Sequence, residues 1–270
     1  MVVRNENNFK SAYTAITEEN GKHAEMLLDF GLLNLKAGET WNCDEQKERA
    51  WLLIKGEAVV EWEGKNETIK RISCFDESPS VLHVPQGVSV SIKAVKDSEF
   101  AVEKKMNTKL FDCKLYRPED VRSDVFGAGV MNDTSRRTVR TVFDGEIAPY
   151  SNMVMGEVIN HPGKWSSYPP HDHPQPEIYH YRHFPEQGFG VSLIDEDPFF
   201  VKNGDTTLVP PNKTHSQVAG AGYAMYYIWM IPHLEDDRWL PSTRYFREDH
   251  KWLTDPDVKI WPELKYGEKK

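Results

Sequence analysis

Residues 163–177 read GKWSSYPPHDHPQPE, and this stretch carries the strongest indication of both the fold and the site. His171 and His173 are two residues apart, so in an extended segment both imidazoles lie on the same side. Glu177 begins an alternating apolar run and can add a carboxylate from that face. His215 follows a Pro-Pro turn, where a neighbouring strand can present it. Three imidazoles and a carboxylate suit a divalent first-row metal with positions left open for water or substrate.

Around this stretch the chain consists mainly of short alternating segments that are separated by turn residues. We expect strands in the first half at residues 58–62, 68–72, 81–84, 88–95 and 99–103. We expect strands in the second half at residues 152–159, 177–183, 188–195, 205–209 and 222–231. A short helical piece is expected around residues 118–120. Many short strands with frequent turns predict an all-β sandwich, jelly roll or small barrel.

The two halves share a faint internal repeat. The sequence VPQG at residues 84–87 is similar to VPPN at residues 209–212, and each follows a short apolar segment. GETW at residues 38–41 is likewise similar to GKW at residues 163–165. Because both matches occur in the same order, they indicate a duplicated unit.

The repeat predicts how the chain divides. We expect a first unit over residues 1–124 and a second over residues 125–235, with the boundary in a polar, irregular stretch. Residues 236–270 are rich in Trp and charge, and we expect this tail to pack on the two units or on a partner subunit. At 270 residues the chain can fold without a structural metal, so a bound metal is expected to be functional.

Composition excludes several partners. The net charge of −9 argues against nucleic acid or an anionic membrane as the main partner. No run of about 18 apolar residues occurs, and the first residues lack the apolar core of a signal peptide. Cys43, Cys74 and Cys113 form no CxxC pair, which is typical of reduced thiols. We therefore expect a cytoplasmic protein.

A second motif strengthens the metal hypothesis. The spacing of Gly204, Pro210, Asn212 and His215 resembles the second cupin motif, with Asn212 where the cupin family usually has glycine. Asn also tolerates the left-handed backbone of a tight turn. The resemblance implies two cupin-type (double-stranded β-helix) barrels in one chain. Val90 stands where His215 would align in the first half, so only the second barrel is expected to bind metal.

The second half resembles one family more closely. The run from Trp165 to His173, followed by residues 176–182 and 187–190, is similar to 5-deoxy-glucuronate isomerase, a relative of 5-keto-4-deoxyuronate isomerase. This resemblance implies metal ligation by His171, His173, Glu177 and His215. It also implies an aldose–ketose isomerase, an intramolecular oxidoreductase, that converts 5-deoxy-glucuronate to 5-dehydro-2-deoxy-gluconate (2-deoxy-5-keto-gluconate) in inositol catabolism. His180 stands where a tyrosine is usual, which leaves another uronate such as 5-keto-4-deoxyuronate open.

Isomerisation through an enediolate needs a metal on two sugar oxygens and a group that carries the proton. Glu177, if it releases the metal, and a hydroxide on the metal are the alternatives for the base. Tyr181 shares the face of Glu177 by strand alternation and is the second expected catalytic residue. The expected contacts to a small anionic sugar acid are Tyr168, Lys164, Arg137, Tyr179 and Tyr227.

The sequence leaves three matters open. The expected cofactor is one divalent ion per chain, with zinc or manganese preferred over iron. An iron-dependent cupin oxygenase would use the same ligands, and a non-enzymatic sugar-binding bicupin is a third alternative. A homo-oligomer is possible for a chain of this kind.

Overall fold

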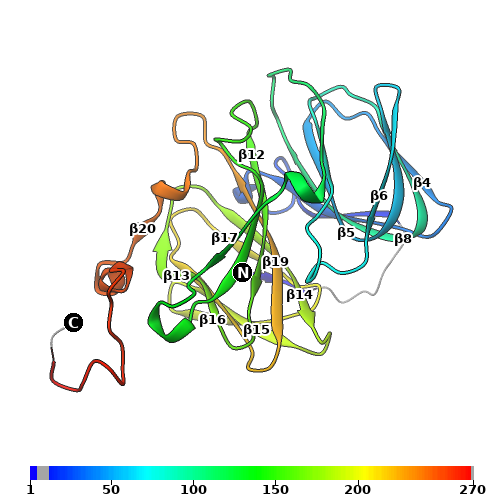
Figure 1. Cartoon of the computed structure of the whole chain (residues 1–270). Helices are drawn as coiled ribbons and strands as arrows, with labels where there is room; N and C mark the ends of the chain where they lie inside the picture. Colours follow the sequence, from blue (N-terminus) through cyan, green and yellow to red (C-terminus); the bar gives the residue numbers. More distant parts are fainter. Residues whose placement is uncertain (5–11, 269–270) are drawn as a thin grey trace.

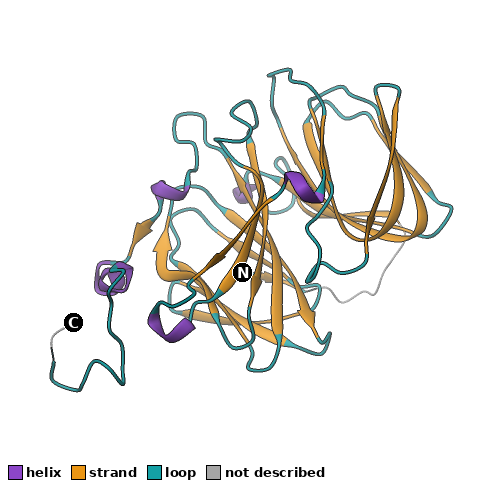
Figure 2. Ribbon diagram, in the orientation of Figure 1, coloured by secondary structure: helices purple, strands orange, loops and turns teal. Residues whose placement is uncertain are grey.

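The computed structural model describes residues 1–4 and 12–268, and this part of the chain is all-β (Figures 1 and 2). Its helices are short 3₁₀ turns, and among the described residues no helix is long and apolar enough to cross a membrane. The two halves form two β units that lie side by side in Figure 1. The all-β prediction is confirmed. The expected absence of a signal peptide falls partly on residues 5–11, which lie outside the described residues.

The first half forms one eight-stranded sheet in the order β2-β3-β8-β5-β7-β9, with β4 on β8 and β6 on β5. Two long strands run through it. The predicted strands 88–95 and 99–103 lie within one of them, β8, except for residues 88 and 89. Its elements are β2 (Ala12–Thr17), η1 (Ala24–Met26), β3 (Asp29–Leu35), β4 (Thr40–Cys43), β5 (Glu48–Trp62), β6 (Lys65–Arg71), β7 (Val81–Val84), β8 (Val90–Lys105) and β9 (Lys114–Tyr116).

The second half forms a seven-stranded sheet, β1-β17-β14-β19-β12-β11-β10, and a five-stranded sheet, β16-β15-β18-β13-β20. The predicted boundary after residue 124 lies inside β10, and the first strand of the chain, β1 (Val2–Val3), pairs with β17 of this half. The strands are β10 (Arg122–Phe126), β11 (Arg137–Phe143), β12 (Met153–Asn160), β13 (Trp165–Asp172), β14 (Glu177–Phe184), β15 (Phe189–Ile194), β16 (Asp197–Lys202), β17 (Thr206–Val209), β18 (His215–Ala219) and β19 (Ala224–Pro232).

Short elements lie between the halves and in the predicted tail. The helical piece expected around residues 118–120 is present as a 3₁₀ turn. These elements are η2 (Pro118–Asp120), η3 (Met131–Asp133), η4 (Pro241–Thr243), β20 (Tyr245–Phe246) and η5 (Glu248–Thr254). β20 pairs with β13, so the tail begins against the second half, and the chain then runs outward to the C-terminus (Figure 1). Residues 269–270 of the tail lie outside the described residues.

A shared apolar core joins the two halves. It contains buried side chains of the first half, such as Phe30 and Leu52, together with buried side chains of the second, such as Met155. A buried ion pair crosses the same interface, where Arg71 Nη1 and Nη2 donate to the Glu157 carboxylate at 2.6 and 2.8 Å. Removing one partner of such a pair would leave the other as a buried charge without an opposite charge beside it, which is strongly destabilising.

The two halves share local features of the backbone around the turns at residues 84–87 and 209–212. The turn after β7 has Gly87 at φ +77°, and the turn after β17 has Asn212 at φ +58°, so both are left-handed. Asn212 therefore replaces glycine at a position that requires this conformation. The strand pairing on each side of these turns also repeats. In β4–β8 Cys43 faces Val90, whereas in β13–β18 His171 faces His215, so Val90 and His215 hold corresponding places in the two pairings.

Candidate metal centre

Three strands of the second half bring the predicted ligands together. β13 carries His171 near its end, and a register shift between Ser166 and His171 interrupts its pairing with β18. Both His171 and His173 are buried. Glu177 opens β14 and His215 opens β18, and both are buried as well. The ligands thus lie where strands begin or end, at positions fixed by backbone pairing.

The closest group consists of His173, Glu177 and His215. Glu177 Oε2 lies 3.2 Å from Nε2 of His173 and 3.2 Å from Nε2 of His215. These three residues offer ligand atoms that all lie within 4.8 Å of one another. The ring centroid of His171 lies 4.8 Å from that of His215, so His171 borders the group, and its role as a fourth ligand stays a prediction.

All three imidazoles are held in one tautomer by the backbone. In each ring Nδ1 donates to a carbonyl two positions away in the chain, which leaves the electron pair on Nε2. The donor–acceptor pairs are His171 Nδ1 to Pro169 O at 3.0 Å, His173 Nδ1 to Gln175 O at 2.9 Å, and His215 Nδ1 to Lys213 O at 3.0 Å.

This arrangement fits a metal ion. With Nδ1 donating, the buried Nε2 of His215 has no hydrogen-bond donor to meet among the described residues, and it faces a carboxylate. Electron pairs that converge in a buried site repel one another unless a cation lies between them. Imidazole and carboxylate donors of this number are those of divalent first-row metal sites.

The electrostatics of the ligands agree with this assignment. Burial opposes charge on His171 and, with the neighbouring His215, lowers its pKa well below the ordinary value, so the ring is neutral and can ligate. Burial would raise the pKa of Glu177, but the adjoining His173 and His215 side chains outweigh burial and lower the pKa. The site therefore presents a neutral His171 imidazole close to an ionised carboxylate.

A pocket opens beside the ligands, and three of the predicted substrate contacts reach it. Arg137, Tyr179 and Tyr227 line it together with His171, His173 and Glu177. Tyr179 Oη lies 3.3 Å from Ser167 Oγ, and Tyr227 Oη donates to Ser166 Oγ at 2.8 Å. Burial raises the pKa of both phenols, that of Tyr227 to about 12, so both are protonated donors at neutral pH.

The remaining predicted residues lie elsewhere. Tyr181 is buried behind the pocket wall, where its hydroxyl donates to Gln217 Oε1 at 2.8 Å. Tyr168 packs against Trp165 with ring centroids 5.4 Å apart, and neither Tyr168 nor Lys164 is part of the pocket lining. Their roles in substrate binding or catalysis stay predictions.

The sequence reasoning missed the contribution of the tail. Trp239 and Arg244 line the pocket, and the ring of Trp239 lies 6.4 Å from that of His173. Phe246 contacts His171 with ring centroids 5.7 Å apart. Gln175 Nε2 donates to Asp237 O at 2.5 Å and holds the tail close to the loop between β13 and β14, which carries His173. The concentration of Trp and charge after residue 236 was the only signal, and it did not indicate where the tail packs.

The fold and the clustered imidazole and carboxylate side chains resemble those of cupin proteins with a possible metal site. The chain is all-β with cupin-like structural neighbours, and it carries a His/Glu cluster of the kind that binds metal. One neighbour is a mutant of Bacillus subtilis oxalate decarboxylase, with a TM-score of 0.57 and 14% identity, covering 87% of this chain and 75% of that one. At this identity the likeness concerns the fold alone.

The chain belongs to the KduI/IolB family, whose model matches residues 1–253. The 5-deoxy-glucuronate isomerase of Geobacillus kaustophilus (strain HTA426) is 29% identical over 246 residues, which cover 80% of this chain and 86% of that protein. The crystal structure of an IolB-like protein from Salmonella typhimurium LT2 has a TM-score of 0.82 and 23% identity, covering 93% of this chain and 98% of that one. The predicted family resemblance is confirmed.

Proposed function

We propose that this chain is a metal-dependent sugar isomerase that interconverts 5-deoxy-glucuronate and 5-dehydro-2-deoxy-gluconate. The observation that carries the metal dependence is the convergence of His173 Nε2, His215 Nε2 and Glu177 Oε2 in a buried site, with the Nδ1 atom of each ring already bonded to a backbone carbonyl. The substrate is proposed from the curated relatives, which match across most of the chain.

The proposed reaction needs a metal ion on the sugar oxygens and a group that moves a proton, and different residues of the pocket serve these two roles. A divalent ion held by His173, His215, Glu177 and the predicted fourth ligand His171 would polarise the two oxygens on the carbons that exchange a proton. Glu177, if it releases the ion, would carry that proton between the carbons, because the other carboxylate on the wall, Asp144, already accepts backbone N–H groups and pairs with an arginine.

Tyr179 supplies a second function beside the carboxylate. Its phenol stays protonated because burial and the negative charge of Glu177 raise its pKa. It therefore acts as a hydrogen-bond donor to a sugar oxygen on which charge develops, and not as a base. Trp229 and Trp239 form apolar wall on the same pocket and keep bulk water from the reacting carbons.

The test measures isomerisation and metal on the same sample. Purified protein is incubated with 5-deoxy-glucuronate in deuterated water, the ketose is followed by NMR, and metal content is determined by mass spectrometry. We expect about one ion per chain and deuterium on the carbon that receives the proton. His171→Ala should lose at least about tenfold in metal affinity and in turnover. The matched control His161→Ala, a half-buried histidine outside the pocket lining, should keep both.

The alternatives predict different results. Retention of both metal and turnover by His171→Ala would contradict the metal centre. Oxygen consumption with the same substrate would indicate an iron-dependent oxygenase, since an isomerase consumes no oxygen. Undiminished sugar binding without turnover after metal removal would indicate a binding protein. Faster turnover of 5-keto-4-deoxyuronate would mean that the substrate is another uronate, while the reaction would still be an aldose–ketose isomerisation.

Four further points belong to the proposal. The ion is zinc or manganese in preference to iron, and there is one per chain. Each half is a cupin-type barrel, and only the second binds metal. The enzyme works in the cytoplasm in inositol catabolism, on a small anionic sugar acid. It assembles as a homo-oligomer, which light scattering tests directly.

A further inference from the structure

The pocket beside the metal ligands carries an excess of positive charge. Three arginines line it, Arg122, Arg137 and Arg244. Arg122 is compensated by acidic partners, with Asp124 at 3.4 Å and Asp144 at 3.8 Å. Arg137 and Arg244 have no carboxylate within ion-pair distance anywhere in the described part of the chain. A divalent ion on the single carboxylate of the ligand group would make the pocket more positive still.

Each of the two uncompensated arginines is anchored at one point and leaves donors free. Arg137 Nη1 donates to Ser135 O at 2.8 Å, and its guanidinium lies over the ring of Phe126 at 5.6 Å. Arg244 Nε donates to Pro241 O at 2.8 Å, and its guanidinium lies over the ring of Phe246 at 6.0 Å. One backbone carbonyl and one ring hold each planar fork in place, while the other N–H groups meet no acceptor among the described residues.

The two cations come from opposite sides of the pocket. Arg137 begins β11 in the seven-stranded sheet, where it pairs with Asn160. Arg244 immediately precedes β20, which joins the five-stranded sheet with Phe246 opposite His171 (Figure 1). Burial lowers the pKa of both guanidiniums; the charge of Arg244 lowers that of Arg137 further, whereas the charge of Glu177 opposes the shift of Arg244.

We propose that Arg137 and Arg244 together form a subsite that binds the carboxylate of a sugar acid, with Arg244 delivered by the C-terminal segment. This inference rests on the proposed function in one respect only, namely that the bound acid is the uronate substrate. In a uronate the carboxylate lies at the end of the carbon chain opposite to the carbons that are isomerised. The metal ligands and the two arginines therefore hold the two ends of one open-chain molecule, and the arginines select acids over neutral sugars.

The test uses gluconate and gluconamide, open-chain polyols that differ only in carrying a carboxylate or an uncharged amide. Binding to the full chain, stripped of metal with a chelator, is measured by calorimetry at low ionic strength. Wild type should bind gluconate at least about tenfold more tightly than gluconamide. Arg137→Met and Arg244→Met should each lose this preference, since a charge-assisted pair contributes about tenfold to hundredfold in affinity. The matched control Arg122→Met should keep it.

Other outcomes decide against the subsite. An equal affinity of wild type for the two probes, or a gluconate preference that survives in the double variant, would overturn it. Arg137→Lys and Arg244→Lys guard against misfolding, and they should retain part of the preference because they keep the charge without the fork. Turnover of 5-deoxy-glucuronate by wild type is measured separately. Its absence would overturn the proposed function, whereas the gluconate preference would still decide the subsite.

Discussion

The two halves of the chain use the same strand pairing but place opposite chemistry at equivalent positions. In each half the short strand before the turn, β7 or β17, pairs with an earlier strand, β5 or β14. Arg49 therefore faces Val84, and Glu177 faces Val209. The equivalent positions, in chain order, are Cys43, Arg49 and Val90 in the first half and His171, Glu177 and His215 in the second. A carboxylate in one half thus corresponds to a guanidinium in the other.

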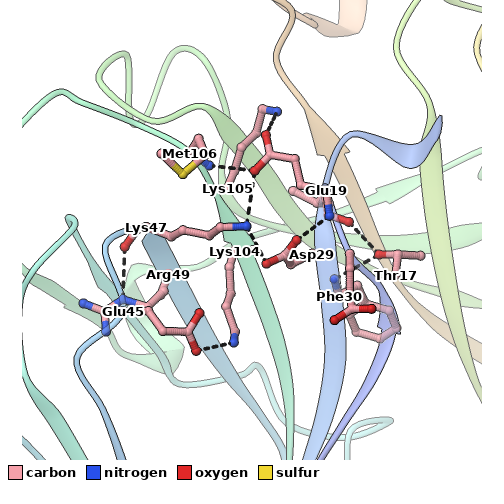
Figure 3. A network of polar contacts seen from close by, with 12 residues as sticks. Thr17, Glu19, Asp29, Phe30, Glu45, Lys47, Arg49, Lys104, Lys105 and Met106 are labelled. Atoms are coloured by element: carbon pink, nitrogen blue, oxygen red, sulfur yellow. Dashed lines mark hydrogen bonds and ion pairs between the residues drawn. The ribbon is translucent and has the colours of Figure 1, made fainter. Parts of the chain in front are cut away.

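The first half supplies its own cation. The buried Arg49 donates through Nη2 to Val88 O at 2.6 Å and Pro85 O at 3.2 Å, and through Nη1 to Cys43 Sγ at 3.2 Å. Figure 3 shows Arg49 beside Lys47, whose carbonyl accepts from Nε at 3.0 Å. The turn carbonyls are therefore satisfied from within the chain. At the equivalent positions the second half has imidazoles and a carboxylate, and the proposed metal ion would take the place of the Arg49 cation. The side chains differ in this way on similarly paired strands.

The largest effect is expected when a residue of the first half is placed at the equivalent position of the second half. His215→Val places at β18 the residue that β8 carries at Val90. We expect metal content to fall below about one tenth of an ion per chain and isomerase activity to fall about a thousandfold or more, because one of the imidazole ligands is gone. Mass spectrometry and the NMR assay check both. The reverse change, Val90→His, should add no second ion, because Arg49 already occupies that region; a second ion there would contradict the comparison.

A second test removes the internal cation. Arg49→Met leaves buried carbonyls of the Pro85–Val88 turn without donors, and we expect the free energy of unfolding to fall by about 3 kcal/mol. Urea unfolding measures this, and metal content should not change because the ligands lie in the other half. Arg117→Met, which removes an exposed ion pair with Glu67 in the same half, should cost less than about 1 kcal/mol. Equal losses in the two variants would show that Arg49 has no special role.

The smallest expected effect concerns buried histidines. In the first half His83 Nε2 lies 2.7 Å from Glu48 Oε1, whereas in the second half neither ring nitrogen of His183 meets a partner among the described residues. Burial lowers the pKa of His183 from 6.5 to about 4, with the charge of Arg182 acting in the same direction and Asp205 against it. The unfolded chain binds this proton near pH 6.5 and the folded chain near pH 4.

His183 should therefore weaken the fold as pH falls through this window and have no effect above it. The unfolded state binds more protons between pH 6.5 and 4, so the free energy of unfolding should fall by on the order of 2 kcal/mol across it. Urea unfolding of wild type and His183→Gln at several pH values checks this. The variant should have a shallower slope below pH 6.5, and an unchanged slope would contradict the assignment.

Much of the fold followed from local pattern. The strands expected at residues 81–84 and 177–183 are present as β7 and β14, because alternation and turn residues are local properties of the chain. The sequence did not predict that residues 88–105 belong largely to one strand, since Lys96 and Asp97 are exposed and resemble a turn. Pairing with β5, through several register shifts, carries β8 across this polar stretch.

The candidate site divides in the same way. Residue types, spacing and the family resemblance were enough to predict the side chains that we propose as metal ligands, because His-x-His on an extended segment and a histidine after a tight turn are local patterns. Tertiary structure alone decided that Arg244 and Trp239 reach the pocket and that Arg49 replaces a ligand in the first half. These contacts join segments that are far apart in the chain. They depend on long-range packing and on buried charge, and the periodicity within one segment carries no information about either.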